Sequence, residues 1–181
     1  NFETRVGRAE DLSAFADRHF DVVYLNSVFH WVADKPRALA EIFRVLKPGG
    51  RLGLNSGDAE RPHQSAVILR SASENAGIAP ERRPQSRNLG AVSTARLRAL
   101  VEGAGFEAYD GATRTIVDQL PDAQDLIDWS RSSSFGNAVA EFDPQELRRL
   151  LAALTRELQP HRHADGFRLE RYLIFATARK P

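Results

Sequence analysis

The sequence predicts an α/β fold built on a mainly parallel sheet. The apolar run Phe20–Leu25 is too short for a helix and has the composition of a buried parallel strand. Apolar residues then recur at helical spacing over 34–46, and another apolar strand follows at Arg51–Asn55. Strand, helix and strand at this spacing form a βαβ unit, whose crossover makes the two strands parallel.

Composition narrows the class of protein. The 181 residues fit one domain with a sizeable core. The 25 basic and 24 acidic side chains nearly cancel, which argues against a general nucleic-acid or membrane-surface binder. The chain has no cysteine, which excludes disulfides, thiolate catalysis and cysteine-rich zinc sites. No apolar run approaches the roughly 20 residues that span a bilayer, and we expect a cytoplasmic protein.

Local signals place the elements around the βαβ unit. Phe2–Val6 has the composition of a short strand, and 7–12 is then the loop that leaves it. Asp34 is the expected N-cap of the central helix, with Pro36 tolerated in the first turn. Lys47–Gly50 is expected to end this helix, because proline cannot extend it and glycine permits a left-handed turn.

The second half alternates helices and strands. Helices are predicted over 65–75 and 93–104, from Pro121, and from Asp143 with Glu146 placed for a capping box. Pro160 is expected to end the last helix. Strands are predicted over 106–117, with a kink or bulge at Gly111, and over 167–179. Arg82 and Arg83 are expected in a solvated loop.

Three segments carry a resemblance to a known family. Phe20–Val23, Phe29–Val32 and Ala38–Leu52, which includes Arg-Val-Leu-Lys-Pro-Gly-Gly, resemble class I S-adenosylmethionine-dependent methyltransferases, most of all the quinone-biosynthesis C-methyltransferases. The later part, with a tryptophan-bearing helical insertion, is similar to trans-aconitate and malonyl-carrier methyltransferases. The resemblance implies a Rossmann-like sandwich, with a mainly parallel sheet and an antiparallel last strand.

The resemblance also implies a domain organisation. We expect one methyltransferase domain over 1–181, incomplete at its N-terminus, with a helical lid or substrate cap over 118–166. The family's first strands and glycine-rich cofactor loop have no counterpart before Phe2. We therefore expect a missing N-terminal segment or a partner chain to supply them, and this chain alone to bind the cofactor weakly or not at all.

The implied cofactor is S-adenosylmethionine, with S-adenosylhomocysteine as product. Ala9 and Glu10 lie where the family contacts adenine, although a helix cap with solvent-facing acids is the alternative interpretation. Asn26 and Ser27 follow a strand end, where open α/β sheets bind ligands; simple turn chemistry is the alternative. The ring of Trp31 either shields the sulfonium or packs beneath the next helix.

Fewer sequence signals point to the residues that would bind the methyl acceptor. His30 is a candidate base for a substrate hydroxyl, amine or carbon acid, or else a structural histidine. Trp129, Arg131 and Ser134 lie on the expected lid, where Arg131 either pairs with an anionic substrate or is solvated. His161 and nearby residues have a superficial metal-site spacing without a fourth ligand, so we predict no metal.

The predicted function is methyl transfer to a small molecule by in-line displacement, with no nucleic acid or membrane span involved. The sequence has no signature that separates O-, N- and C-methylation. The alternative is a truncated, split or degenerate methyltransferase-fold module that does not catalyse alone. A nicotinamide-dependent dehydrogenase shares the sheet type. The Lys-Pro-Gly-Gly turn and the His30-Trp31 pair argue against that third class.

Overall fold

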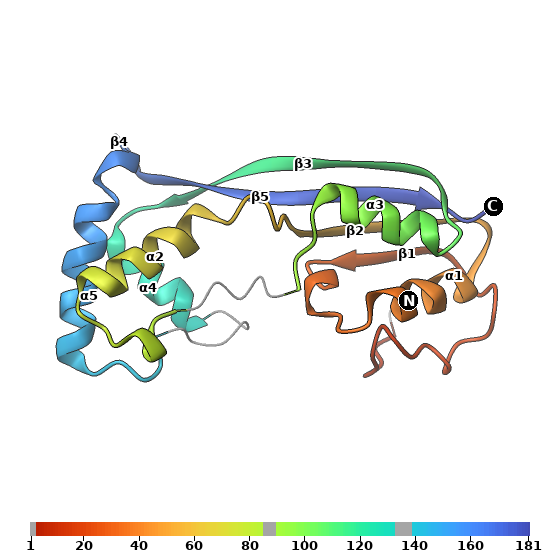
Figure 1. Ribbon diagram of the computed structural model, residues 1–181, viewed down its shortest axis with the longest axis horizontal. Helices are drawn as coiled ribbons and strands as arrows, with labels where there is room; N and C mark the ends of the chain where they lie inside the picture. The colour runs from red at the N-terminus through yellow and green to blue at the C-terminus, as the bar shows by residue number, and fades with distance from the viewer. Residues whose placement is uncertain (1–2, 85–89, 133–138) are drawn as a thin grey trace. The chain divides into compact units, whose positions relative to one another are not determined.

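A computed structural model describes residues 3–84, 90–132 and 139–181 of the chain. The chain folds into two compact units, which are described separately (Figure 1). The first unit comprises residues 1–61, 88–114 and 173–181. The second comprises residues 62–87 and 115–172. Whether residues 118–166 act as a lid stays a prediction.

The sheet has the strand order β1-β2-β5-β3. Strand β1 (Phe20–Asn26) pairs in parallel with β2 (Leu46–Gly57), as the βαβ prediction requires. Strand β2 pairs in antiparallel fashion with the last strand, β5 (Gly166–Arg179), which confirms the expected direction of that strand. Strand β3 (Glu107–Leu120) lies on the other side of β5 and runs without interruption through Gly111.

The central helix forms as its local signals predict. Helix α1 (Lys35–Val45) begins after Asp34, whose carboxylate accepts a hydrogen bond from the Arg37 backbone N–H at 3.0 Å. Gly49 has φ +77°, the left-handed conformation that glycine adopts without strain. Strand β2 starts directly at Leu46, five residues before the predicted start, because Leu46 already pairs with Phe20.

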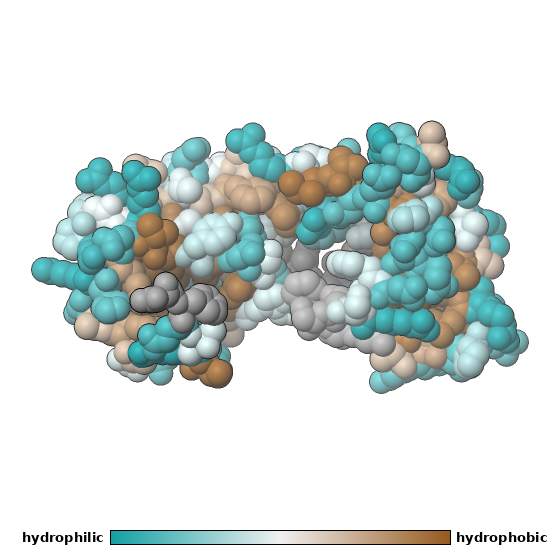
Figure 2. All heavy atoms as spheres, turned by 180° about the vertical axis from the view of Figure 1, so that it is seen from behind, coloured by the Kyte–Doolittle hydropathy of each residue, from teal (hydrophilic) through white to brown (hydrophobic). Residues whose placement is uncertain are grey.

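The core of the first unit lies between the sheet and two helices, α1 and α3 (Thr94–Gly103). Its buried apolar residues include Leu25, Phe29, Leu39, Ile42, Leu52, Leu54, Leu97, Val101, Tyr109 and Ile174. The other side chains of the sheet are less covered: Val22 and Tyr24 of β1 are 59% and 56% exposed. Figure 2 shows exposed apolar side chains among polar ones on the side opposite to that of Figure 1.

The predicted strand over Phe2–Val6 is wrong for the part that the structure describes. Residues 3–7 form no strand, and Val6 is fully exposed. β-branched and aromatic side chains favour a strand only where a neighbouring strand completes the hydrogen bonds. In the described parts of the chain no strand pairs with this segment.

The second unit packs helices against residues 115–120 of β3 and 166–172 of β5. Helices α2 (Gln64–Asn75), α4 (Ala123–Ser132) and α5 (Pro144–Glu157) confirm three predicted helices. Three short elements complete it: the 3-10 turns η2 (Pro80–Arg82) and η3 (Gln159–His161), and β4 (Arg162–His163), which pairs with β5. Its core residues include Ile68, Leu69, Leu126, Ile127, Leu150, Leu154, Phe167 and Leu169. Nowhere in the described part of the chain is there a helix both long and apolar enough to cross a membrane.

The arginines expected in a solvated loop have defined partners instead. Both terminal nitrogens of Arg82 donate to the carboxylate of Glu146, at 2.7 and 2.9 Å. Arg83 donates to the carbonyl oxygen of Ile78 at 2.8 Å. The Arg82–Glu146 pair joins η2 to the first turn of α5, across 64 residues of sequence that local patterns do not connect.

The start of α5 provides a test of pH dependence. The backbone N–H of Asp143 and the guanidinium of Arg82 hold the pKa of Glu146 below its usual value. A lowered pKa means that ionised Glu146 stabilises the fold above its unfolded pKa, and that this contribution is lost as the pH falls through the folded pKa. We expect Glu146→Gln to flatten the fall in melting temperature between about pH 5 and about pH 3.

Thermal unfolding followed by circular dichroism measures this effect. Glu141→Gln removes the same charge from a neighbouring exposed residue and serves as the matched control. Its acid dependence is expected to follow the parent protein. Equal slopes for the parent and Glu146→Gln would show that this carboxylate does not contribute to acid unfolding.

Candidate functional site

The two parallel strands end in the same tripeptide. Leu25-Asn26-Ser27 spans the end of β1, whose last residue is Asn26, and Leu54-Asn55-Ser56 lies near the end of β2. The register pairs Leu25 with Leu54 and Asn26 with Asn55. Polar side chains from both strands therefore gather at the carboxyl edge of the sheet, where open α/β sheets bind ligands.

Asn55 holds this edge together. Its Oδ1 accepts hydrogen bonds from the backbone N–H and the hydroxyl of Ser27, at 2.7 and 2.9 Å. Its Nδ2 donates to Asn26 Oδ1 at 2.8 Å and to the Tyr24 hydroxyl at 2.9 Å. Asn55 is 5% exposed, and Ser27 is held at φ +54°, a conformation that non-glycine residues seldom adopt.

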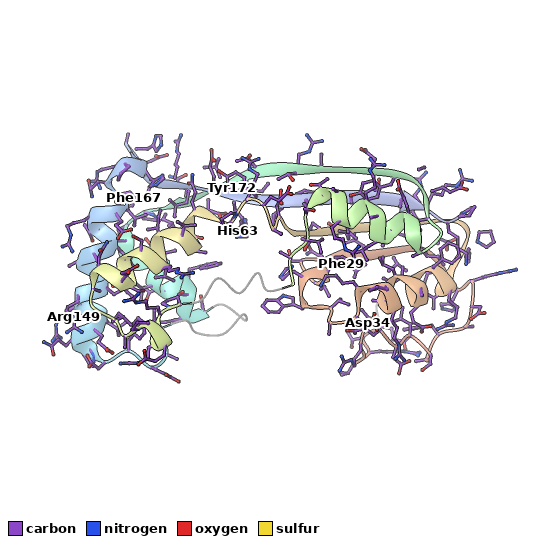
Figure 3. The ribbon with its side chains drawn as sticks, in the orientation of Figure 1. Phe29, Asp34, His63, Arg149, Phe167 and Tyr172 are labelled. Atoms are coloured by element: carbon purple, nitrogen blue, oxygen red, sulfur yellow. The ribbon has the colours of Figure 1, made fainter. Side chains whose placement is uncertain are left out.

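The His30-Trp31 pair follows this edge in the 3-10 turn η1 (Phe29–Trp31). The two rings lie 4.9 Å apart at 51°, and His30 Nδ1 is 3.4 Å from the hydroxyl of Ser56. Phe29 is fully buried and holds the turn against the core, as Figure 3 locates it. Trp31 is 47% exposed, so much of its ring surface faces solvent.

The turn predicted to contact adenine lies beside the end of η1. The N–H of Asp11 donates to the Arg8 carbonyl at 3.1 Å, which closes a tight turn around Ala9 and Glu10. The Glu10 carboxylate accepts from the Ala33 N–H at 3.1 Å. Backbone N–H groups, of Glu10 itself and then of Ala33, lower the pKa of this carboxyl, so it is ionised at neutral pH.

Two neighbours shape the same region. Lys35 Nζ donates to the Val32 carbonyl at 2.9 Å, and burial lowers the pKa of this amine, opposed by the charge of Glu10. A Cβ at Gly90 would lie 2.0 Å from the carbonyl oxygen of His30. Glycine at this position therefore allows the chain to pass directly against η1.

Five residues are predicted to bind the cofactor: Ala9, Glu10, Asn26, Ser27 and Trp31. The structure places all five in the first unit, together with His30. The lid residues Trp129 and Arg131 lie on α4 of the second unit. Arg131 is exposed and pairs with the carboxylate of Asp128 at 3.5 Å. Ser134 lies outside the described residues. Site assignments for all of these side chains stay predictions.

No group of three or more histidine, aspartate or glutamate side chains among the described residues has the arrangement of a metal site. His161 belongs to η3 and His163 to β4, which pairs with the start of β5.

Asn55 and Ser56 are the site residues that the sequence reasoning missed. The sequence predicts Asn55 only as the last residue of a strand. The signal was present, because the tripeptide Leu-Asn-Ser occurs after both apolar strands. Two parallel strands that end in the same polar pair place those pairs side by side.

Comparison with known proteins finds methyltransferases among the similar sequences. A model of the methyltransferase domain matches residues 1–54. Trans-aconitate 2-methyltransferase of Methylobacterium radiotolerans is 27% identical over 179 residues, which cover 91% of this chain and 65% of that relative. The ubiquinone/menaquinone biosynthesis C-methyltransferase of Psychromonas ingrahamii is 52% identical over 44 residues, 24% of this chain and 17% of that relative.

Solved structures show the same fold. The YcgJ protein of Bacillus subtilis superposes with a TM-score of 0.57 at 16% identity, covering 96% of this chain and 69% of that protein. The chain is thus similar to class I S-adenosylmethionine-dependent methyltransferases in sequence, and its fold is the Rossmann-like α/β fold of the matched structure. It spans 65% and 61% of the length of the trans-aconitate methyltransferases of Methylobacterium radiotolerans and Deinococcus radiodurans.

Proposed function

We propose that this chain takes part in methyl transfer from S-adenosylmethionine to a small-molecule acceptor. The observation that carries the proposal is the polar edge formed by Asn26, Ser27 and Asn55, with the His30-Trp31 pair directly after it. The similarity to methyltransferases supports the reaction class. The geometry supports the position of the cofactor site.

The chemistry of the residues present fits this cofactor. The Glu10 carboxylate is oriented by the Ala33 N–H, and an ionised acceptor suits the amine of adenine. Asn26 is exposed, so its amide is accessible to a ligand hydroxyl beyond the bond it accepts from Asn55. The exposed ring of Trp31 suits a sulfonium, because an aromatic face attracts a cation.

When bound, S-adenosylmethionine supplies a methyl group on a sulfonium, and in-line transfer leaves S-adenosylhomocysteine. The protein's part is to align the acceptor and to exclude water. His30 accepts the acceptor's proton where the acceptor is a hydroxyl, an amine or a carbon acid. Ser56, at 3.4 Å from Nδ1, orients that imidazole.

We further propose that additional methyltransferase residues, from a longer chain or from a partner, complete the cofactor site. The matched relatives extend beyond the region aligned with this chain. On β1, Val22 and Tyr24 remain largely exposed. Apolar side chains of a parallel strand are usually covered on both faces, which supports a further layer over this one.

Titration with S-adenosylhomocysteine, followed by NMR of the backbone and indole N–H groups, tests the cofactor site. We expect weak binding, in roughly the millimolar range, because part of the site is supplied elsewhere. The signals that shift are expected to be those of Ala9, Glu10, Asn26, Ser27 and the Trp31 indole.

Matched variants sharpen this titration. Asn26→Ala is expected to weaken the response, whereas Asn75→Ala, an exposed asparagine of α2, should leave it unchanged. Shifts confined to other residues would overturn the proposed site. Micromolar affinity would instead contradict the need for additional residues.

A further inference from the structure

The second unit contains a pocket whose lining includes one of the predicted site residues, Trp129. Its volume is about 330 Å³, which suits a small molecule. Its lining residues come from α2, β3, α4 and β5: Ser65, Val117, Asp118, Gln119, Leu120, Leu126, Trp129, Leu169 and Arg171. Trp129 belongs to this lining and Arg131 does not, so the arginine at the pocket is a different one from the arginine predicted on the lid.

The walls of this pocket are mainly apolar. Leu126 and Leu169 belong to the buried core, and Leu120 packs against that core. Trp129 is 52% exposed and contributes an aromatic side chain to the lining. An apolar ligand body of about ring size would bury surface against these side chains.

The two charged side chains of the lining, Arg171 and Asp118, form an ion pair with each other. Arg171 donates from Nε and Nη2 to the two carboxylate oxygens of Asp118, at 3.0 and 2.9 Å. The charges of the lining therefore sum to zero. Among the described residues, Arg171 Nη1 has no hydrogen-bond partner, and each Asp118 oxygen has accepting capacity left.

At neutral pH His63 adds no positive charge beside this pair. His63 precedes α2 and lies next to β5, which carries Tyr172, as Figure 3 shows. Burial, and then the charge of Arg171, lower the pKa of His63, so its imidazole is neutral at pH 7. An anionic ligand would meet the Asp118 carboxylate and one guanidinium whose charge is already paired.

We infer that this pocket binds an uncharged small molecule with a ring-sized apolar body and a hydroxyl group. The hydroxyl donates to a carboxylate oxygen of Asp118, so it joins the ion pair without adding charge. The further assignment of this bound molecule as the methyl acceptor rests on the proposed function. It favours a neutral alcohol over a polycarboxylate such as the substrate named for the trans-aconitate relatives.

Fluorescence of Trp129 tests the inference without cofactor. The chain has two tryptophans, so Trp31→Phe leaves Trp129 as the sole reporter. Three probes share one ring and differ in the head group: cyclohexanol, cyclohexanecarboxylate and cyclohexylammonium. We expect saturable binding of cyclohexanol, at least about tenfold tighter than that of either ion.

A charge variant tests the role of the ion pair. Asp118→Asn frees Arg171, so cyclohexanecarboxylate is expected to gain about tenfold in affinity and to overtake cyclohexanol. Asp128→Asn removes a carboxylate of α4 outside the pocket lining and should preserve the parent order. Circular dichroism checks that each variant is folded.

The probe order on the parent background decides the inference even if Asp118→Asn does not fold. Tighter binding of cyclohexanecarboxylate or trans-aconitate than of cyclohexanol would overturn it, as would the absence of saturable cyclohexanol binding. Because this assay reports on the second unit without cofactor, its failure is distinct from failure of the S-adenosylhomocysteine titration, which reports on the first unit.

Discussion

Asn55→Ala is expected to destabilise the protein by about 2–4 kcal/mol, because its four hydrogen bonds lie at a nearly buried position. The substitution leaves the backbone N–H of Ser27 without its acceptor, beside a strained backbone at φ +54°. The hydroxyl of Tyr24 and the amide of Asn26 also lose a partner. Relaxation of Ser27 toward an ordinary conformation would then move the residues that lead into η1.

Urea unfolding of the parent and the variant measures this loss. Asn26→Ala is the matched control: it has the same chemistry on the neighbouring strand, but its exposed side chain makes only one of these bonds. We expect the control to lose about 1 kcal/mol or less. A loss for Asn55→Ala no larger than that of the control would refute the central place of Asn55.

The second large effect is expected at Phe29. Its side chain is 0% exposed, in the core between the sheet and helices α1 and α3. Phe29→Ala removes this ring and leaves a cavity, at a cost of about 3–5 kcal/mol. The Nζ of Lys35, 5.6 Å from the ring centroid, also loses its aromatic neighbour.

The position of Phe29 couples this core contact to the candidate site. His30 and Trp31 follow it in the same three-residue turn, so loss of the ring is expected to loosen both. Urea unfolding measures the stability, and Trp31 emission in a Trp129→Phe background reports on the turn. Val28→Ala is the control, since Val28 is 43% exposed and should cost about 0.5 kcal/mol or less. Similar losses for the two variants would contradict the anchoring role.

Much of the fold followed from signals a few residues long. Asp34 caps α1 because its carboxylate reaches an N–H three residues on, and Gly49 adopts a left-handed turn that its missing Cβ permits. The capping box of Asp143 and Glu146 is equally local. Each of these contacts depends on short-range geometry, which the order of residues already specifies.

Errors arose where a side chain or strand depends on a distant partner. Residues 3–6 have strand-like composition, yet a strand forms only when another strand pairs with it. Arg82 lies in a polar segment that predicts a solvated loop, but its guanidinium binds Glu146, 64 residues later. Arg171 and Asp118, separated by 53 residues, form the pocket's ion pair on two different strands.

The candidate site divides in the same way. The end of β1 at Asn26 and the His30-Trp31 pair after it can be predicted from the sequence, because apolar runs and motif spacing are local properties. The contacts of Asn55 with Ser27 and Asn26, and the place of Arg171 rather than Arg131 in a pocket lining, depend on long-range packing. The physical reason is strand register: it sets which distant side chains meet, and it follows from the packing of the whole sheet.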